Sequence, residues 1–152
     1  MKLAEALLLR ADYQKRMSKL RFRLVRSAQV QEGDKPAQDP KELLAELEQV
    51  ATDLERLIQN INRTNSVSEL GESGTLTDAL ATPDLLRPKQ DIYSELASHA
   101  TETPGRVSRS EIKFQSTVDV AAIQKQADDL AVAHRELDTR IQEANWHLEL
   151  KE

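Results

Sequence analysis

The sequence predicts an all-α protein: an antiparallel bundle of about four long helices that pack like coiled coils. The strongest indication is a run of seam residues near the C-terminus whose spacing alternates between four and three, the heptad repeat of helices that pack against other helices. Aromatic residues make up only 3% of the chain and charged residues 31%, a balance that suits long exposed helices better than sheets. The seam consists of Ile123, Ala127, Leu130, His134, Leu137, Ile141, Ala144 and Leu148.

Length, charge and cysteine content limit the classes of protein. We expect one domain over residues 1–152. The net charge of −5 argues against a dedicated nucleic-acid binder, so no nucleic-acid partner is expected. The absence of cysteine excludes disulfides, thiolate metal sites and cysteine nucleophiles. The longest apolar run near the N-terminus, residues 6–9, is too short for a signal-peptide core or a membrane span, so we expect a cytoplasmic protein without a membrane partner.

The first two helices are expected over residues 1–31 and 40–63. Between them Gly33 and Pro36 break the chain, and Asp39 and Pro40 restart it as N-cap and first helical residue. The polar face of the first helix is basic and that of the second is acidic. A basic helix joined by a short loop to an acidic one predicts an antiparallel hairpin with complementary flanks.

The middle of the chain is less regular. Residues 64–82 are polar, with a short helical turn expected from about Thr77, and a third helix is expected over residues 83–100. A short extended stretch is expected near residues 110–118, before the last helix begins near Asp119. The side chains of the third helix expected to face inward are Leu85, Leu86, Ile92, Leu96 and Ala100.

Sequence motifs of common enzymes and metal sites are absent. The chain has no glycine-rich phosphate loop, no His-Glu-x-x-His helix and no Gly-x-Ser-x-Gly elbow. Each histidine has a carboxylate four residues away, as in the pair His134 and Asp138, but such pairs are common in a charged helical chain. We therefore expect no metal and no cofactor. His134 occupies a seam position, where a polar residue usually fixes register or oligomeric state.

Several polar residues are not required by the heptads. Because the second and last helices of an up-down-up-down bundle end where the first begins, these residues are expected to meet at one end. Two interpretations remain open: helix caps with buried hydrogen bonds, which is the commoner case, or a small anion- or ligand-binding pocket around Arg63 and Arg140. The candidate ligand-binding residues are Asn62, Arg63, Asn65, Thr75, Thr77, Asp78, Arg140 and Asn145.

A second group of residues is predicted to contact another subunit. Trp146 lies off the seam, and a short extended segment over residues 109–113 could pair across a two-fold axis. Together with the polar seam position, these features predict a homo-oligomer. The candidate interface residues are Arg109, Glu111, Lys113, His134 and Trp146.

Five stretches of the chain, residues 1–7, 61–65, 75–80, 108–114 and 139–146, resemble a small bacterial family of unknown function that is commonly called septicolysin. The most distinctive are Asn-Arg-Thr-Asn at 62–65 and Ser-Glu-Ile-Lys-Phe at 110–114. The name implies a secreted, thiol-activated pore-forming toxin, and the resemblance implies no catalytic residue.

The combined features favour a self-associating structural or interaction protein with a small-anion or ligand pocket at one end. An enzyme of unknown reaction is one alternative, and its active site would need five charged residues to meet in one cavity. A membrane-active protein acting through the basic first helix is disfavoured, because the chain has no cysteine to activate and the apolar face of that helix resembles an ordinary bundle face. The five residues of the enzyme alternative are Arg63, Asp78, Arg109, Glu111 and Arg140.

Overall fold

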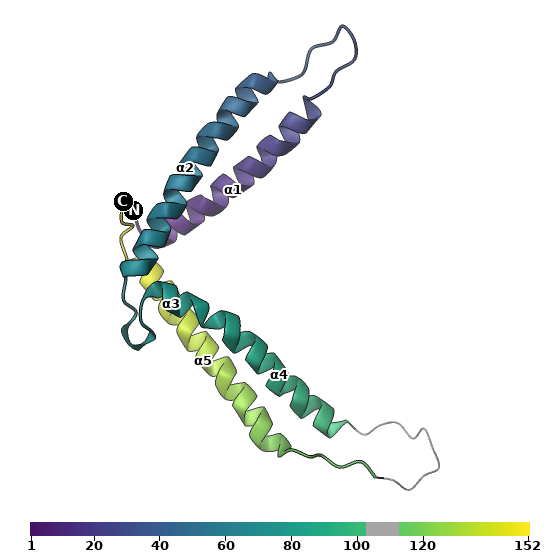
Figure 1. Cartoon of the computed structure of the whole chain (residues 1–152), viewed down its shortest axis with the longest axis vertical. Helices are drawn as coiled ribbons and strands as arrows, with labels where there is room; N and C mark the ends of the chain where they lie inside the picture. The colour runs from purple at the N-terminus through teal and green to yellow at the C-terminus, as the bar shows by residue number, and fades with distance from the viewer. Residues whose placement is uncertain (103–112) are drawn as a thin grey trace. The chain divides into compact units, whose positions relative to one another are not determined.

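The computed structural model describes residues 1–102 and 113–152, and it confirms the all-α class (Figure 1). These residues form two compact units. The first comprises Met1–Glu69 and Glu143–Glu152, and the second comprises Leu70–Gln142. The elements are α1 (Leu3–Arg26), α2 (Pro40–Val67), the 3-10 helix η1 (Gly71–Ser73), α3 (Leu76–Ala81), α4 (Pro83–Thr101) and α5 (Val120–His147).

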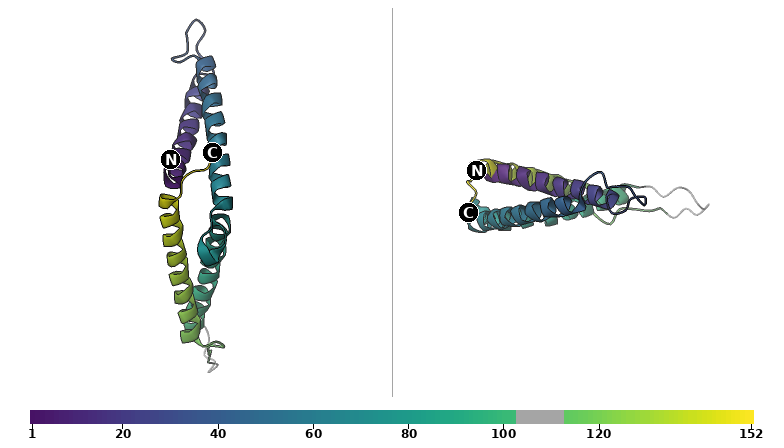
Figure 2. Two further views of the ribbon diagram at one scale, coloured as in Figure 1. Left: turned by 90° about the vertical axis from the view of Figure 1, so that its left-hand side faces the viewer. Right: turned by 90° about the horizontal axis from the view of Figure 1, so that it is seen from above.

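The first unit is built on the predicted antiparallel hairpin, in which α1 and α2 lie side by side (Figures 1 and 2). Asp39 caps α2 by accepting a hydrogen bond from the Lys41 N–H at 2.9 Å, and Pro40 is the first helical residue, as the sequence predicts. The buried core of the hairpin contains Leu20, Leu43 and Val50. Half-buried side chains that pack against this core are Tyr13, Met17, Leu24 and Leu47.

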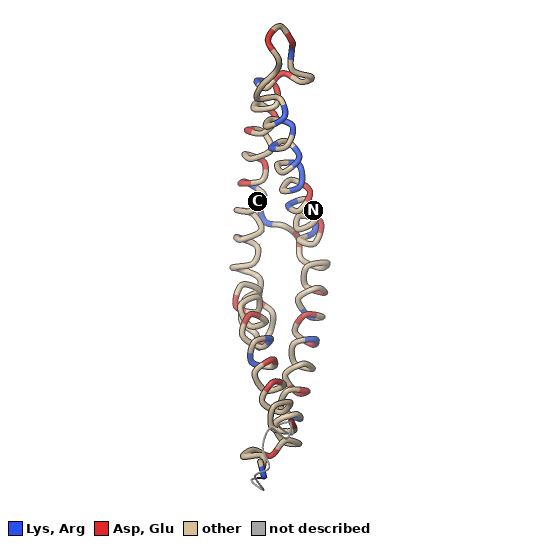
Figure 3. Tube along the Cα trace, turned by 90° about the vertical axis from the view of Figure 1, so that its right-hand side faces the viewer, with Lys and Arg blue, Asp and Glu red and all other residues tan. Residues whose placement is uncertain are grey.

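The polar faces of the two helices of the hairpin carry opposite charges, as predicted. Lys and Arg residues are distributed along α1, and Asp and Glu residues are distributed along α2 (Figure 3). Glu46 on α2 accepts from the Arg16 guanidinium at 2.7 and 3.0 Å and lies 3.7 Å from that of Arg23. Each exposed pair contributes only about 0.2–1 kcal/mol, so these charges select the partner helix while apolar burial supplies the stability.

The ends of the first two helices differ from the sequence prediction. Helix α1 stops at Arg26 instead of near residue 31, and α2 continues to Val67 instead of stopping at residue 63. The extra turn of α2 contains Thr64, whose side chain is fully buried on the apolar stripe of the helix. Helix α5 ends at His147, because the chain after it becomes extended and pairs with the N-terminus.

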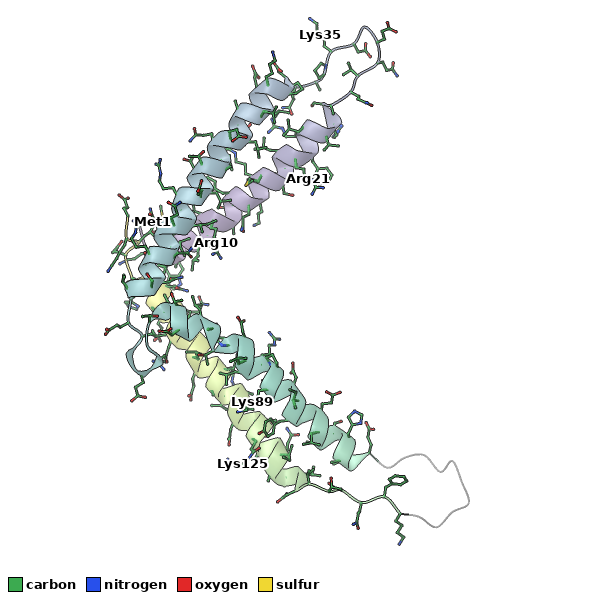
Figure 4. All side chains as sticks on the ribbon, viewed as in Figure 1. Met1, Arg10, Arg21, Lys35, Lys89 and Lys125 are labelled. Carbon is green, nitrogen blue, oxygen red and sulfur yellow. The ribbon has the colours of Figure 1, made fainter. Side chains whose placement is uncertain are left out.

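The chain after α5 closes the first unit. The Leu3 N–H donates to the Leu148 carbonyl at 2.9 Å, and the Leu150 N–H donates to the Met1 carbonyl at 2.8 Å. These bonds form an isolated antiparallel bridge between Lys2 and Glu149 beside Met1 (Figure 4). The start of α1 and the ends of α2 and α5 therefore lie together within this unit, whereas the candidate polar residues at 75–78 and 140 belong to the second unit.

The second unit consists of η1, α3, α4 and the greater part of α5. None of the eight predicted seam residues is exposed, and Ala127, Leu137 and Ile141 are buried. The predicted extended stretch lies partly outside the described residues, at 110–112, and residues 113–119 form neither helix nor strand.

The inner face predicted for α4 is largely wrong. Leu85, Ile92 and Leu96 are 75%, 65% and 43% exposed, whereas Ala97 is buried. The apolar residues of α4 form two stripes displaced by one residue, both with heptad spacing, so the sequence pattern does not decide which stripe faces the core. The inner stripe consists of Leu86, Tyr93, Ala97 and Ala100.

Candidate functional site

The predicted ligand-binding residues are divided between the two units. The first unit holds Asn62, Arg63, Asn65 and Asn145, and the second holds Thr75, Thr77, Asp78 and Arg140.

In the first unit, Thr64 joins two chain segments, although it is not among the candidate site residues predicted from the sequence. The buried Thr64 hydroxyl donates to the Asn60 carbonyl at 2.7 Å and accepts from the Lys151 N–H at 2.9 Å. Arg63 is exposed and donates only to the neighbouring Asn60 side chain, at 3.5 Å. Thr64 continues the heptad spacing of Leu57 and Ile61, which is the signal that could have identified it. Its contacts join α2 to the C-terminal segment.

Charged groups reinforce the same closure. The Lys2 ammonium lies 2.6 Å from the Glu149 carboxylate, and the α-amino group of Met1 lies 3.2 Å from it. The hydrogen bond from Lys2, followed by that from the α-amino group, holds the pKa of Glu149 below the usual range of a glutamate. The Lys2 ammonium also donates to the His147 carbonyl at 3.2 Å, near the C-terminal end of α5.

In the second unit, Thr75 and Asp78 form the N-terminal cap of α3. The Thr75 N–H and hydroxyl donate to one Asp78 carboxylate oxygen at 2.9 and 2.7 Å, and the Asp78 N–H donates back to the Thr75 hydroxyl at 3.2 Å. This is a capping box. The side-chain and backbone hydrogen bonds from Thr75 lower the pKa of Asp78. Both residues therefore have a local structural role.

Arg140 stabilises the turn that precedes α3 by a hydrogen bond to its backbone. Its guanidinium donates to the Leu70 carbonyl at 2.7 Å, and the Leu70 N–H donates to the Gly74 carbonyl at 2.7 Å. Gly71 has φ = +59°, and a Cβ atom there would lie 3.6 Å from the guanidinium. A residue with this φ is strained unless it is glycine. The Arg140 guanidinium thus has a backbone partner within its own unit.

A groove of about 450 Å³ lies between α4 and α5. The half-buried side chain of His134, at its seam position, contributes to the lining, and so does Gln90 from α4. The lining also contains two guanidinium groups and one carboxylate, so the groove has mixed charge. The lining residues are Arg87, Gln90, Asp128, Ala131, Val132, His134 and Arg135.

Of the other four predicted interface residues, the structure describes two. Arg109 and Glu111 lie outside the described residues, whereas Lys113 and Trp146 are exposed. Within residues 1–102 and 113–152, no three His, Asp or Glu side chains are grouped so as to hold a metal ion. In the same part of the chain, every helix is too short or too polar to cross a membrane.

These observations define an all-helical protein of two units. Several of its polar residues cap a helix, donate to the backbone or form ion pairs within their own unit. The chain belongs to a family of unknown function, DUF6847, whose model matches residues 10–150. It is similar to a crystal structure described as a functionally unknown conserved protein from Corynebacterium diphtheriae, with 48% sequence identity, 99% coverage of both chains and a TM-score of 0.84.

Comparison with curated proteins found no match. The family of unknown function agrees with one part of the resemblance noted in the sequence. Neither the family nor the similar crystal structure supports the name septicolysin.

Proposed function

We propose that the chain is a self-associating interaction protein whose helices present apolar faces to other copies of the same chain. The observation that carries the proposal is the row of large exposed apolar side chains on a helix of each unit. On α1 these are Leu8, Phe22 and Val25, and on α4 they are Leu85, Ile92 and Leu96.

Single exposed apolar residues are ordinary in soluble proteins, but rows with heptad spacing are typical of helices that pack against a partner. Leu8 and Phe22 are two heptads apart, and Leu85 and Ile92 are one heptad apart. A pair of helices buries one face of each helix, whereas a bundle of four buries a wider face. The second row on α4 is therefore placed where an additional helix would pack.

The expected association is reversible. Burying one such row on each of two copies would contribute on the order of 8 kcal/mol, because each fully buried side chain of this size contributes about 1.5–3 kcal/mol and these are partly exposed. Association itself costs about 4–15 kcal/mol. The two terms are comparable, so the assembly is expected to depend on protein concentration.

Sedimentation velocity over a concentration series, from low micromolar to several hundred micromolar, tests the proposal. We expect the mass to rise above the 17.1 kDa of one chain as the concentration increases. A mass of 17.1 kDa throughout the series would contradict self-association.

The proposal rests on helix faces because the polar residues considered for a ligand pocket or an active site have local partners. Asp78 belongs to the cap of α3, and Arg140 is bonded to the Leu70 carbonyl.

A further inference from the structure

Helix α1 carries a cationic stripe on the side opposite its core-facing residues. Helix α1 contains seven Lys or Arg residues against two Asp or Glu residues. Arg16 and Arg23 are directed to Glu46, but other cations follow the exposed apolar row at heptad intervals. We call this the α1 stripe; its residues are Leu8, Asp12, Lys15, Lys19, Phe22, Val25 and Arg26, all exposed.

Helix α4 carries a stripe of the opposite sign. Each of its exposed apolar residues directly follows a carboxylate in the sequence. One cation, Lys89, lies among them. We call this the α4 stripe; its residues are Asp84, Leu85, Lys89, Asp91, Ile92, Glu95 and Leu96, all exposed.

We infer that the α1 stripe of one copy docks on the α4 stripe of a second copy. This inference rests on the proposed self-association and names its contact surfaces. Lys19 and Arg26 on α1 are seven residues apart, as are Asp84 and Asp91 on α4. One register therefore lets both cations meet both carboxylates.

The order of residues around each helix fixes the relative direction of the two helices. Around α1, viewed from its N-terminus, the apolar row is followed by Lys19 and Arg26. Around α4, viewed from its N-terminus and in the same direction of rotation, the carboxylates precede the apolar row. The comparison is possible because successive residues rotate about the axis in the same direction in both helices. The charged residues therefore lie on one side of the apolar row in α1 and on the other side in α4. When two helices run parallel, these two sides face each other, as the e and g positions do in parallel coiled coils. Parallel docking in this register thus pairs the charges and places Phe22 and Val25 of α1 against the apolar row of α4, whereas Leu8 lies before the start of α4.

Charge also disfavours the two alternative pairings. Two α1 stripes would place three cations of one copy against three of the other, and two α4 stripes would do the same with carboxylates. Like charges brought together at an interface are unfavourable and suppress the wrong partner. The α1 and α4 stripes are the combination that places opposite signs together.

A charge-exchange experiment on the full chain tests the contact. The α1 variant carries Lys19→Glu and Arg26→Glu, and the α4 variant carries Asp84→Lys and Asp91→Lys. Each variant alone should self-associate about tenfold more weakly than the wild type, because two attractive pairs become repulsive at each contact. A chain that carries all four substitutions should return to within about threefold of the wild-type dissociation constant, because the signs are again opposite.

The controls separate folding from association. Arg56→Glu reverses an exposed charge on α2 outside both stripes and should leave the dissociation constant unchanged. Circular dichroism of every variant should show unchanged helix content. Self-association of the wild type should also weaken as salt is raised, because surface charges are screened.

Each result decides the inference. Weakening by both double variants and recovery in the fourfold variant would support it. Wild-type self-association that neither double variant weakens, or that the fourfold variant fails to recover, would overturn this contact and leave self-association standing. A wild type that remains a monomer at every concentration would overturn both proposals.

Discussion

Thr64 shows how one buried polar residue can bond to its own helix and to a distant segment of the chain. It lies on the apolar stripe of α2 and is fully buried, yet its hydroxyl has two hydrogen-bond partners. Within the described residues, no buried side-chain nitrogen or oxygen lacks a partner. Buried polar groups are tolerated when they are paired in this way, and removing one partner leaves the other group unsatisfied.

Thr64→Val keeps the shape of the side chain but removes the hydroxyl. The Lys151 N–H then loses its acceptor, so we expect a loss of about 1 kcal/mol in the free energy of unfolding, measured by chemical denaturation. Ser66→Ala is the matched control, because the exposed Ser66 hydroxyl only donates to the Arg63 carbonyl; its effect should stay within about 0.5 kcal/mol. Equal effects of the two substitutions would contradict the structural role of Thr64.

At the scale of elements, α2 offers two leucines whose environments differ. Leu54 is 8% exposed, and Leu44 is 49% exposed. Leu54→Ala should lower the free energy of unfolding by about 2–5 kcal/mol, because it leaves a cavity in a packed face. Leu44→Ala, on the same helix, should cost clearly less. Urea denaturation of both variants measures the difference, and a loss below about 0.5 kcal/mol for Leu54→Ala would show that the stripe is assigned wrongly.

The α1–α2 hairpin was predictable because its signals are local. The N-cap at Asp39, the proline that follows it and the opposite charges of the two helices lie within one stretch of sequence. The last turn of α2 was not predictable in this way. Thr64 and its polar neighbours are weak helix formers, and the contact that holds this turn in a helix comes from Lys151, 87 residues away.

The face of α4 was mispredicted for a different reason. Its two apolar stripes have the same heptad spacing and differ by one residue, so periodicity supports both equally. The structure buries the stripe that contains Ala97 and exposes the one that contains Ile92. The candidate site was predictable only as a set of polar residues. Which of them cap a helix, as Asp78 does, depends on neighbours whose geometry the spacing does not specify.

At the scale of the whole molecule, α5 joins the two units as one continuous helix. Residues up to Gln142 belong to the second unit, and its last turn and the segment after it belong to the first. The first unit is therefore made of two chain segments far apart in the sequence. The hydrogen bonds of residues 148–151 to Met1, Leu3 and Thr64 join these segments.

Deletion of residues 148–152 should loosen the first unit and leave the second unchanged. The Leu3 N–H loses its carbonyl partner, so its hydrogen exchange should become about tenfold faster, corresponding to about 1.4 kcal/mol. Amides of α4 and α5 near Ala97 and Ala127, which belong to the second unit, should keep their protection. Hydrogen exchange followed by NMR measures both groups of amides in one experiment.

Glu149→Gln is the control for the deletion, because it weakens the ion pairs with Lys2 and the α-amino group but keeps the backbone bonds. Its effect on the Leu3 amide should be much smaller. If the deletion accelerated exchange equally in both units, α5 would transmit the loss from one unit to the other, and they would unfold as one cooperative body. A difference confined to the first unit would instead show that a helix can be continuous in the chain and still belong to two separately stabilised units.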